Sequence, residues 1–98
     1  MQTRIVTAKE TKQTEKNIPV GNVSMDLVLH PVGQEAPMHA HDQTHLIFVR
    51  SGRMSFNLGG KVCEVNQGDF IIVPPGVSHN FKVIGDEPCQ TACVSVPC

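Results

Sequence analysis

The sequence contains no tryptophan and no tyrosine, and its four phenylalanines make up only 4% of the chain. Proteins that bind single-stranded nucleic acid stack bases on exposed aromatic side chains, and here the aromatic residues Phe48, Phe56, Phe70 and Phe81 look like core residues. Neither sign of charge prevails, because eight Lys and Arg oppose nine Asp and Glu. Such a chain creates no strong field to attract nucleic acid or an anionic membrane surface. We therefore expect neither of these partners.

Long apolar runs are also lacking. No stretch approaches the roughly 18 apolar residues of a membrane span, and residues 1–17 lack the apolar segment of a signal peptide. We therefore expect a cytoplasmic protein. With 98 residues, the chain suits one domain, in which residues 1–20 form an N-terminal arm with a first strand and residues 21–98 form the main body.

Helical periodicity is absent as well, and the chain instead shows short alternating or apolar segments separated by glycine and proline. Residues 9–17 are polar and predict a surface loop, whereas the apolar run at 69–73 predicts a strand covered on both faces. About eight short strands at close intervals favour an all-β barrel or sandwich. The predicted strands span residues 4–8, 23–31, 44–50, 53–58, 61–65, 69–73, 78–84 and 90–96.

Histidines are concentrated in one stretch, where His39, His41 and His45 fall within seven residues. In an extended segment, side chains two positions apart point to the same side, so these three share a parity. Imidazole nitrogens converging on one side of a sheet form a donor set for a divalent transition metal. A fourth candidate, His79, follows a Pro-Pro-Gly turn, and the remaining histidine, His30, is interpreted as a core or surface residue.

Two motifs carry a family resemblance. The first is GQEAPMHAHDQTHLIFVRSG at residues 33–52, and the second is GDFIIVPPGVSHNFKV at residues 68–83. Their glycine, proline and histidine spacing resembles the two motifs of the cupin superfamily. Two positions depart from that pattern: His45 stands where the family usually has Glu, and Val83 stands where it usually has Asn. The resemblance implies a small double-stranded β-helix barrel, a metal inside it and a homodimer.

On this resemblance the predicted metal ligands are His39, His41, His45 and His79. Four neutral imidazoles leave the +2 charge of the metal uncompensated, so the site should favour anionic or enolisable ligands. Manganese or iron is favoured, and zinc, nickel and copper remain possible. An octahedral ion would leave two positions open, whereas a tetrahedral ion would be closed by four histidines and could be structural.

Strand parity supplies candidates for the wall of a substrate pocket. Ile47, Met54, Phe56 and Phe81 are the main ones, and Val49, Met25 and Leu27 are further ones on the same reasoning; all are equally suited to a barrel core. Four-histidine small cupins that this chain resembles include manganese- or iron-type dioxygenase-like proteins and zinc-type polyketide cyclases. The leading prediction is therefore a dioxygenase-like oxidoreductase that acts on a small organic molecule. The alternatives are a redox-neutral isomerase or cyclase, and a non-catalytic metal- or ligand-binding cupin. The sequence identifies no catalytic residue.

The four cysteines do not match a metal-binding spacing. Without an export signal, reduced thiols are expected rather than disulfides. Cys89 and Cys93 share a strand face with Thr91 and Ser95, and the simplest interpretation is that they are small buried side chains. A second hypothesis is that one cysteine lies near the barrel metal. The cysteines are Cys63, Cys89, Cys93 and Cys98.

Overall fold

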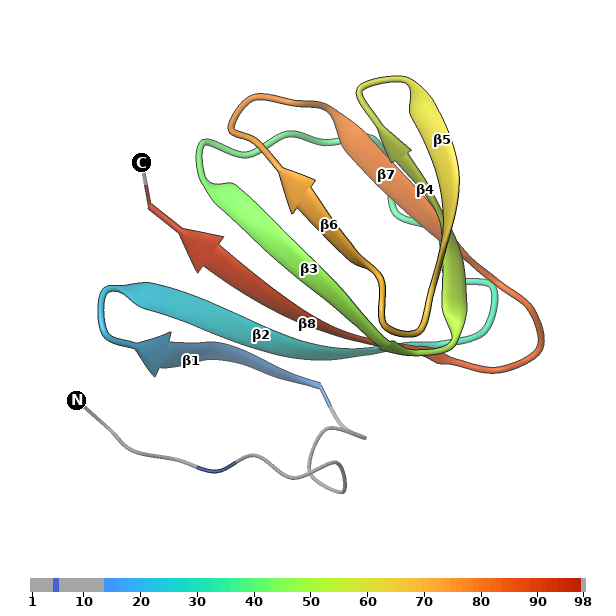
Figure 1. Ribbon diagram of the computed structural model, residues 1–98, viewed down its shortest axis with the longest axis horizontal. Helices are drawn as coiled ribbons and strands as arrows, with labels where there is room; N and C mark the ends of the chain where they lie inside the picture. The colour runs from blue at the N-terminus through green and yellow to red at the C-terminus, as the bar shows by residue number, and fades with distance from the viewer. Residues whose placement is uncertain (1–4, 6–13, 98) are drawn as a thin grey trace.

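The computed structural model describes residue 5 and residues 14–97 (Figure 1). Its described residues form eight β-strands and no helix, which confirms the all-β prediction. Seven strands lie within two residues of the predicted bounds. The strands are β1 (Glu15–Val20), β2 (Val23–His30), β3 (Thr44–Ser51), β4 (Arg53–Leu58), β5 (Lys61–Asn66), β6 (Phe70–Val73), β7 (His79–Ile84) and β8 (Cys89–Val96).

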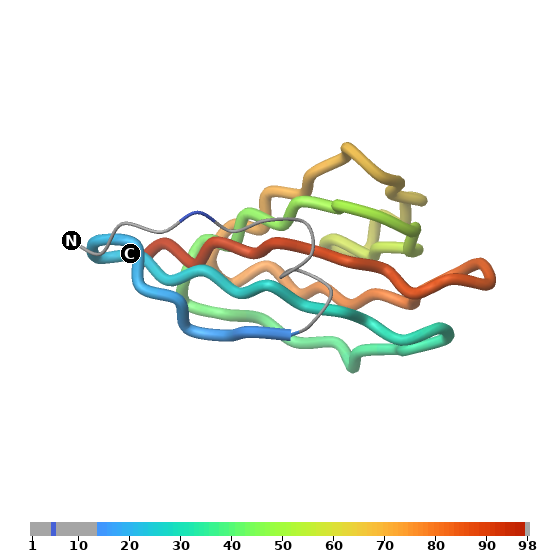
Figure 2. The backbone as a smooth tube through the Cα atoms, turned by 90° about the horizontal axis from the view of Figure 1, so that it is seen from below, coloured from blue at the N-terminus to red at the C-terminus, as the bar shows by residue number. Residues whose placement is uncertain are grey.

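The strands build two antiparallel sheets that face each other, as Figures 1 and 2 show. One sheet has the order β1-β2-β8-β3-β6, and the other has the order β5-β4-β7. Side chains alternate across each strand, so one face of each sheet points into the space between them. The main core lies there, and its most deeply buried side chains are Met54, Val73, Val83 and Cys89.

The first strand differs from the prediction. Residues 9–17 were expected to form a loop, but β1 begins at Glu15 and pairs with β2. The polar side chains before Ile18 are compatible with a strand because β1 is an edge strand with mostly exposed residues. Pro19 is tolerated for the same reason, since an edge strand has one unpaired side. The strand predicted at residues 4–8 lies outside the described residues except for Ile5.

Strand β6 also differs, because only one of its faces is covered within the described part of the chain. Ile71 and Val73 are buried, whereas Phe70 and Ile72 are 59% and 53% exposed. Phe48, on the neighbouring strand β3, is 40% exposed and its ring lies 5.7 Å from that of Phe70. The prediction of a strand buried on both faces is therefore wrong. Phe48 and Phe70 are surface residues of the outer sheet face, not core residues.

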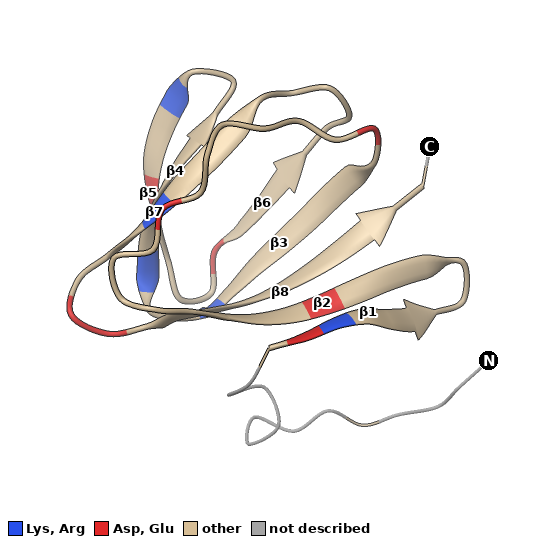
Figure 3. Ribbon diagram, turned by 180° about the vertical axis from the view of Figure 1, so that it is seen from behind, with Lys and Arg blue, Asp and Glu red and all other residues tan. Residues whose placement is uncertain are grey.

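Charged residues are spread over several strands and loops of the described chain, with no extended region of one sign (Figure 3). This distribution matches the nearly balanced charge of the sequence. Two exposed ion pairs stand on the smaller sheet and beside it, between Arg53 and Glu64 at 3.7 Å and between Lys82 and Glu35 at 3.3 Å. Among the residues described, no helix is long and apolar enough to cross a membrane.

Candidate metal centre

Backbone pairing brings the two histidine motifs together. The chain between β2 and β3 runs antiparallel to β7, and two backbone hydrogen bonds join His39 and His79 at N···O distances of 3.0 and 2.8 Å. The turn before β7 is fixed to the same segment, because the Gly76 amide donates to the carbonyl oxygen of His41 at 2.8 Å. Residues 40 positions apart in sequence are thereby held side by side.

Three of the four predicted ligands form one cluster. The potential ligand nitrogens of His39, His41 and His79 all lie within 4.8 Å of one another. Imidazole nitrogens bind divalent metals at about 2.0–2.1 Å, so an ion among them requires only small side-chain rotations. His79 is 3% exposed and lies at the base of the cluster, whereas His39 and His41 are partly exposed. The ring of Phe56 lies parallel to that of His79 at a centroid distance of 6.0 Å.

Hydrogen bonds fix the tautomers of two of these rings. Nδ1 of His39 lies 2.7 Å from the carbonyl oxygen of Pro37, and Nδ1 of His79 lies 3.0 Å from the carbonyl oxygen of Val77. A carbonyl oxygen can only accept, so each Nδ1 carries a proton, and in the neutral ring the lone pair is then on Nε2. This arrangement is typical of metal-binding histidines, whose second nitrogen donates to a carbonyl or carboxylate. The donor set therefore fits a divalent transition metal.

His45 lies beside this cluster but is not part of it. Its ring is stacked on that of His41 at a centroid distance of 4.3 Å. Its Nε2 lies 3.4 Å from Oγ of Ser95, and its Nδ1 lies 3.8 Å from Sγ of Cys93. The structure thus brings together three of the four predicted ligands, and the four-histidine site is not confirmed.

Burial lowers the pKa values of His41 and His45 below the usual 6.5, and the nearby histidines lower them further. Both effects disfavour the imidazolium form. A metal requires neutral imidazole, so these pKa shifts favour the protonation state that could bind one. The electrostatics of the cluster agree with its geometry.

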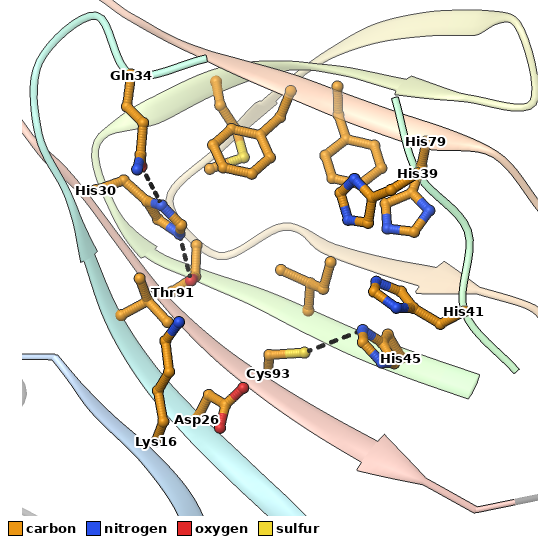
Figure 4. Close-up of a pocket in the computed structure, with 15 residues that line it drawn as sticks. Lys16, Asp26, His30, Gln34, His39, His41, His45, His79, Thr91 and Cys93 are labelled. Carbon is orange, nitrogen blue, oxygen red and sulfur yellow. Dashed lines mark hydrogen bonds between the residues drawn. The ribbon is translucent and has the colours of Figure 1, made fainter. Parts of the chain in front are cut away.

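The four predicted ligand histidines line one end of a cavity of about 340 Å³ between the two sheets (Figure 4). The four main pocket candidates, Ile47, Met54, Phe56 and Phe81, all lie along its wall. Val49, by contrast, belongs to the packed core. Met25 and Leu27, the two candidates from β2, do not line the cavity, because they pack in a second cluster on the opposite sheet face. A one-residue difference in parity moves a side chain to the other face of a strand.

Sequence reasoning missed the polar residues of the cavity. On β2 the cavity-facing residues are Asp26, Val28 and His30, which alternate with the apolar residues that were chosen instead. The choice followed hydrophobicity, whereas the inner face of this strand is the more polar one. These three residues share one parity, but both faces of the strand are partly buried, so parity did not show which face lines the cavity. The other missed lining residues are Lys16, Gln34 and Thr91.

Three cysteines are described, and all three are free thiols. Cys89 and Cys93 have pKa values raised to about 11, chiefly by burial, so both stay protonated at neutral pH. Cys93 lines the cavity and its Sγ lies 3.8 Å from Nδ1 of His45, so it is the cysteine to which the hypothesis of a thiol near the metal now applies. Cys63 is exposed, and Cys98 lies outside the described residues.

Comparison with solved structures finds the same fold in proteins of low sequence identity. An uncharacterised Klebsiella pneumoniae protein with a double-stranded β-helix domain is 24% identical, with a TM-score of 0.84 over 98% of this chain and 91% of that one. The Bacillus halodurans protein BH2720 is 20% identical, with a TM-score of 0.85 over 98% and 83%. The cupin domain of Schizosaccharomyces pombe Cnp3 is 16% identical, with a TM-score of 0.80 over 87% of this chain. The match spans only 64% of the Cnp3 chain.

No curated protein matches the sequence. The sequence model of the family described as Cupin domain matches residues 26–95, which is more than two thirds of the chain. This match contains β3 to β7 and the four predicted ligand histidines. The two-sheet fold and the sequence match agree, and the chain belongs to the cupin family.

Proposed function

We propose that this protein is a metal-dependent cupin enzyme that acts on a small, largely apolar organic molecule. The observation that carries the proposal is the convergence of His39, His41 and His79 at one end of an apolar-walled cavity. Backbone carbonyl oxygens set two of these rings so that Nε2 is free to bind an ion. A site with three protein ligands retains open coordination positions, as catalytic metal sites do.

His45 is proposed as a fourth ligand. Its contacts with Ser95 and Cys93, at 3.4 and 3.8 Å, are long for hydrogen bonds and cost little to break. The ring is stacked on that of His41, with the two centroids 4.3 Å apart, so His45 lies next to a member of the cluster. Four imidazoles would leave the charge of a manganese or iron ion uncompensated and would favour an anionic or enolisable substrate.

The leading reaction class is dioxygenase-like oxidation of the substrate. A bound manganese or iron ion would supply redox chemistry and Lewis acidity in the same cavity. The chain's own contribution is the apolar wall formed by Ile47, Met54, Phe56 and Phe81, which suits both an apolar substrate and molecular oxygen. A cavity of about 340 Å³ falls near the lower end of the roughly 300–1,000 Å³ typical of ligand pockets, so the substrate is small.

A metal-loading and oxygen-uptake experiment tests this proposal. The protein is reconstituted separately with Mn²⁺, Fe²⁺ and Zn²⁺ and supplied with a panel of small phenols, enols and diketones. Oxygen consumption that requires Mn²⁺ or Fe²⁺ and is lost in His39→Ala supports the oxidoreductase. Substrate conversion without oxygen uptake supports the isomerase or cyclase alternative instead. Metal binding without turnover of any compound supports a binding protein.

We further propose that the protein forms a homodimer through the outer face of β3 and β6. The exposed side chains of Phe48, Phe70 and Ile72 form an apolar surface there, and β6 is an edge strand of its sheet. An exposed apolar edge strand is a template for pairing with another chain, and a second copy would cover it. Analytical ultracentrifugation tests this proposal, which a monomer at all concentrations contradicts.

A further inference from the structure

A second polar cluster lies at the end of the cavity remote from the metal-binding histidines. It consists of His30 at the end of β2, Gln34 in the following segment and Thr91 on β8. Figure 4 shows these three residues on the opposite side of the cavity from His39 and His79, with apolar side chains between the two groups. The sequence pattern gave this cluster no role.

The hydrogen bonds within the cluster have a determined direction. Nδ1 of His30 lies 2.6 Å from Oε1 of Gln34, an amide oxygen that can only accept, so Nδ1 carries the proton. Burial lowers the pKa of His30 and outweighs the Gln34 hydrogen bond, which raises it, while the charge of Lys16 lowers it further, so a neutral ring is favoured. Nε2 then has a lone pair and accepts a hydrogen bond from the Thr91 hydroxyl, with Nε2 and Oγ 3.0 Å apart. The only proton of the Thr91 hydroxyl is therefore committed to His30.

This order leaves Oγ of Thr91 with acceptor capacity only. The residue is 4% exposed and lines the cavity, so its two lone pairs can accept a hydrogen bond from a group inside the cavity. A carbonyl or carboxylate oxygen placed there would face another acceptor. A hydrogen-bond donor placed there would satisfy it.

The cluster is held on rigid elements. Thr91 lies in the middle strand β8, where it is paired with Val28 of β2 on one side and with Val49 of β3 on the other. The carbonyl oxygen of Gln34 accepts a hydrogen bond from the backbone amide of Val83 at 2.8 Å. The His30 ring packs edge-on against Phe81 at a centroid distance of 4.9 Å. Such fixed positions give a hydrogen-bonding group its selectivity.

We propose that Thr91, oriented by His30 and Gln34, binds a neutral hydroxyl group at the end of the substrate remote from the metal. The preferred substrates are then small molecules with a metal-binding oxygen at one end, an apolar or aromatic middle and an alcohol or phenol at the other end. The metal-binding half of this statement rests on the proposed function, whereas the hydroxyl half rests on the cluster alone. A neutral hydroxyl is preferred to an ammonium group because the Lys16 charge already acts on the His30 ring.

The test compares two compounds of nearly equal shape, 4-hydroxybenzoate and 4-methylbenzoate. Affinities are measured by calorimetry or by NMR titration for the wild type, Thr91→Val and Thr91→Ser, each with Mn²⁺ or Zn²⁺ and without metal. Metal content is determined separately for each variant. Long-range ¹H–¹⁵N spectra of the wild type report the tautomer of His30.

The wild type should bind the hydroxy compound about tenfold more tightly, as expected for one buried hydrogen bond that the methyl compound leaves unmade. Thr91→Val should abolish this preference with unchanged metal content, and Thr91→Ser should retain it. The His30 spectrum should show a neutral ring protonated at Nδ1. A purely structural cluster would leave the preference of Thr91→Val equal to that of the wild type.

Three results would overturn the proposal: equal affinities for the two compounds in the wild type, a preference that survives in Thr91→Val, or no binding of either compound up to millimolar concentrations. A wild type that binds no metal but still prefers the hydroxy compound would refute the proposed metal function and support the hydroxyl site. The two proposals therefore fail separately.

Discussion

His41→Ala should remove the stabilisation that a metal confers while leaving the metal-free fold almost unchanged. His41 is one of the three clustered ligands, but it precedes β3 in a partly exposed segment outside the packed core. His79, by contrast, is 3% exposed and packs against Phe56, so its removal would also open a cavity. His41 is therefore the ligand whose loss is most specific to metal binding.

The magnitude follows from linkage between binding and folding. An ion that binds only the folded state at a free concentration of 100 times its dissociation constant adds about 2.7 kcal/mol to the free energy of unfolding. Mutation of a residue that only hydrogen-bonds a metal ligand typically weakens metal binding about 10–100-fold. Loss of a ligand itself should weaken binding at least as much. At 100-fold weaker affinity the same metal concentration adds only about 0.4 kcal/mol. For a domain of this size, the wild-type increment corresponds to a rise in melting temperature of roughly 10–20 °C.

The assay is thermal unfolding with and without Mn²⁺ or Zn²⁺, at a metal concentration set by titration of the wild type. His30→Ala is the matched control, because it removes a histidine from the same cavity but not from the metal cluster. The control should retain the full metal-dependent increment, and metal-free His41→Ala should unfold within a few degrees of the metal-free wild type. An unchanged increment in His41→Ala, or an equal loss in His30→Ala, would refute the assignment of the cluster.

Three further predictions concern pH, backbone conformation and assembly. Burial lowers the pKa of His30 in the folded protein, so near pH 6.5 the unfolded chain binds more protons than the folded chain. The free energy of unfolding of the metal-free protein should therefore fall between about pH 7.5 and 5.5 in urea unfolding experiments. The fall should be smaller in His30→Phe. Gly52 has φ of 75° and an added Cβ would lie 2.5 Å from the Pro88 carbonyl oxygen, whereas one at Gly60, with φ of 92°, would contact nothing within 4 Å. Gly52→Ala should therefore cost at least about 3 kcal/mol and Gly60→Ala about 1 kcal/mol; equal losses in denaturant unfolding would contradict this. Phe70→Ser should convert the proposed dimer to a monomer in sedimentation velocity, and an unchanged sedimentation coefficient would place the interface elsewhere.

The strands were largely predictable because they depend on local chemistry, and the histidine cluster was predictable because its two motifs resemble those of cupins. Glycine and proline bound the strands, and alternating side chains define their faces. Strand parity puts His39 and His41 on one side, and the resemblance of the two motifs to those of cupins implied that His79 joins them. The backbone hydrogen bonds between residues 39 and 79 show why, since the segment before β3 pairs directly with β7.

The remaining features depend on neighbours that a single strand does not reveal. Phe70 and Ile72 look like core residues in the sequence, but β6 is an edge strand and none of the described residues covers its outer face. Both faces of β2 carry partly buried residues, so hydrophobicity favoured Leu27 over His30 as a cavity residue. His45 has the right parity, but its ring contacts Ser95 and Cys93 on β8, a strand about 50 residues away in sequence.

The most direct test of the central claim is metal analysis with X-ray absorption spectroscopy on protein purified from its native host. We predict about one divalent transition metal per chain, with at least three imidazole nitrogens as ligands, and loss of that ion in the His39→Ala variant. Absence of stoichiometric metal, or an ion retained in His39→Ala, would contradict it.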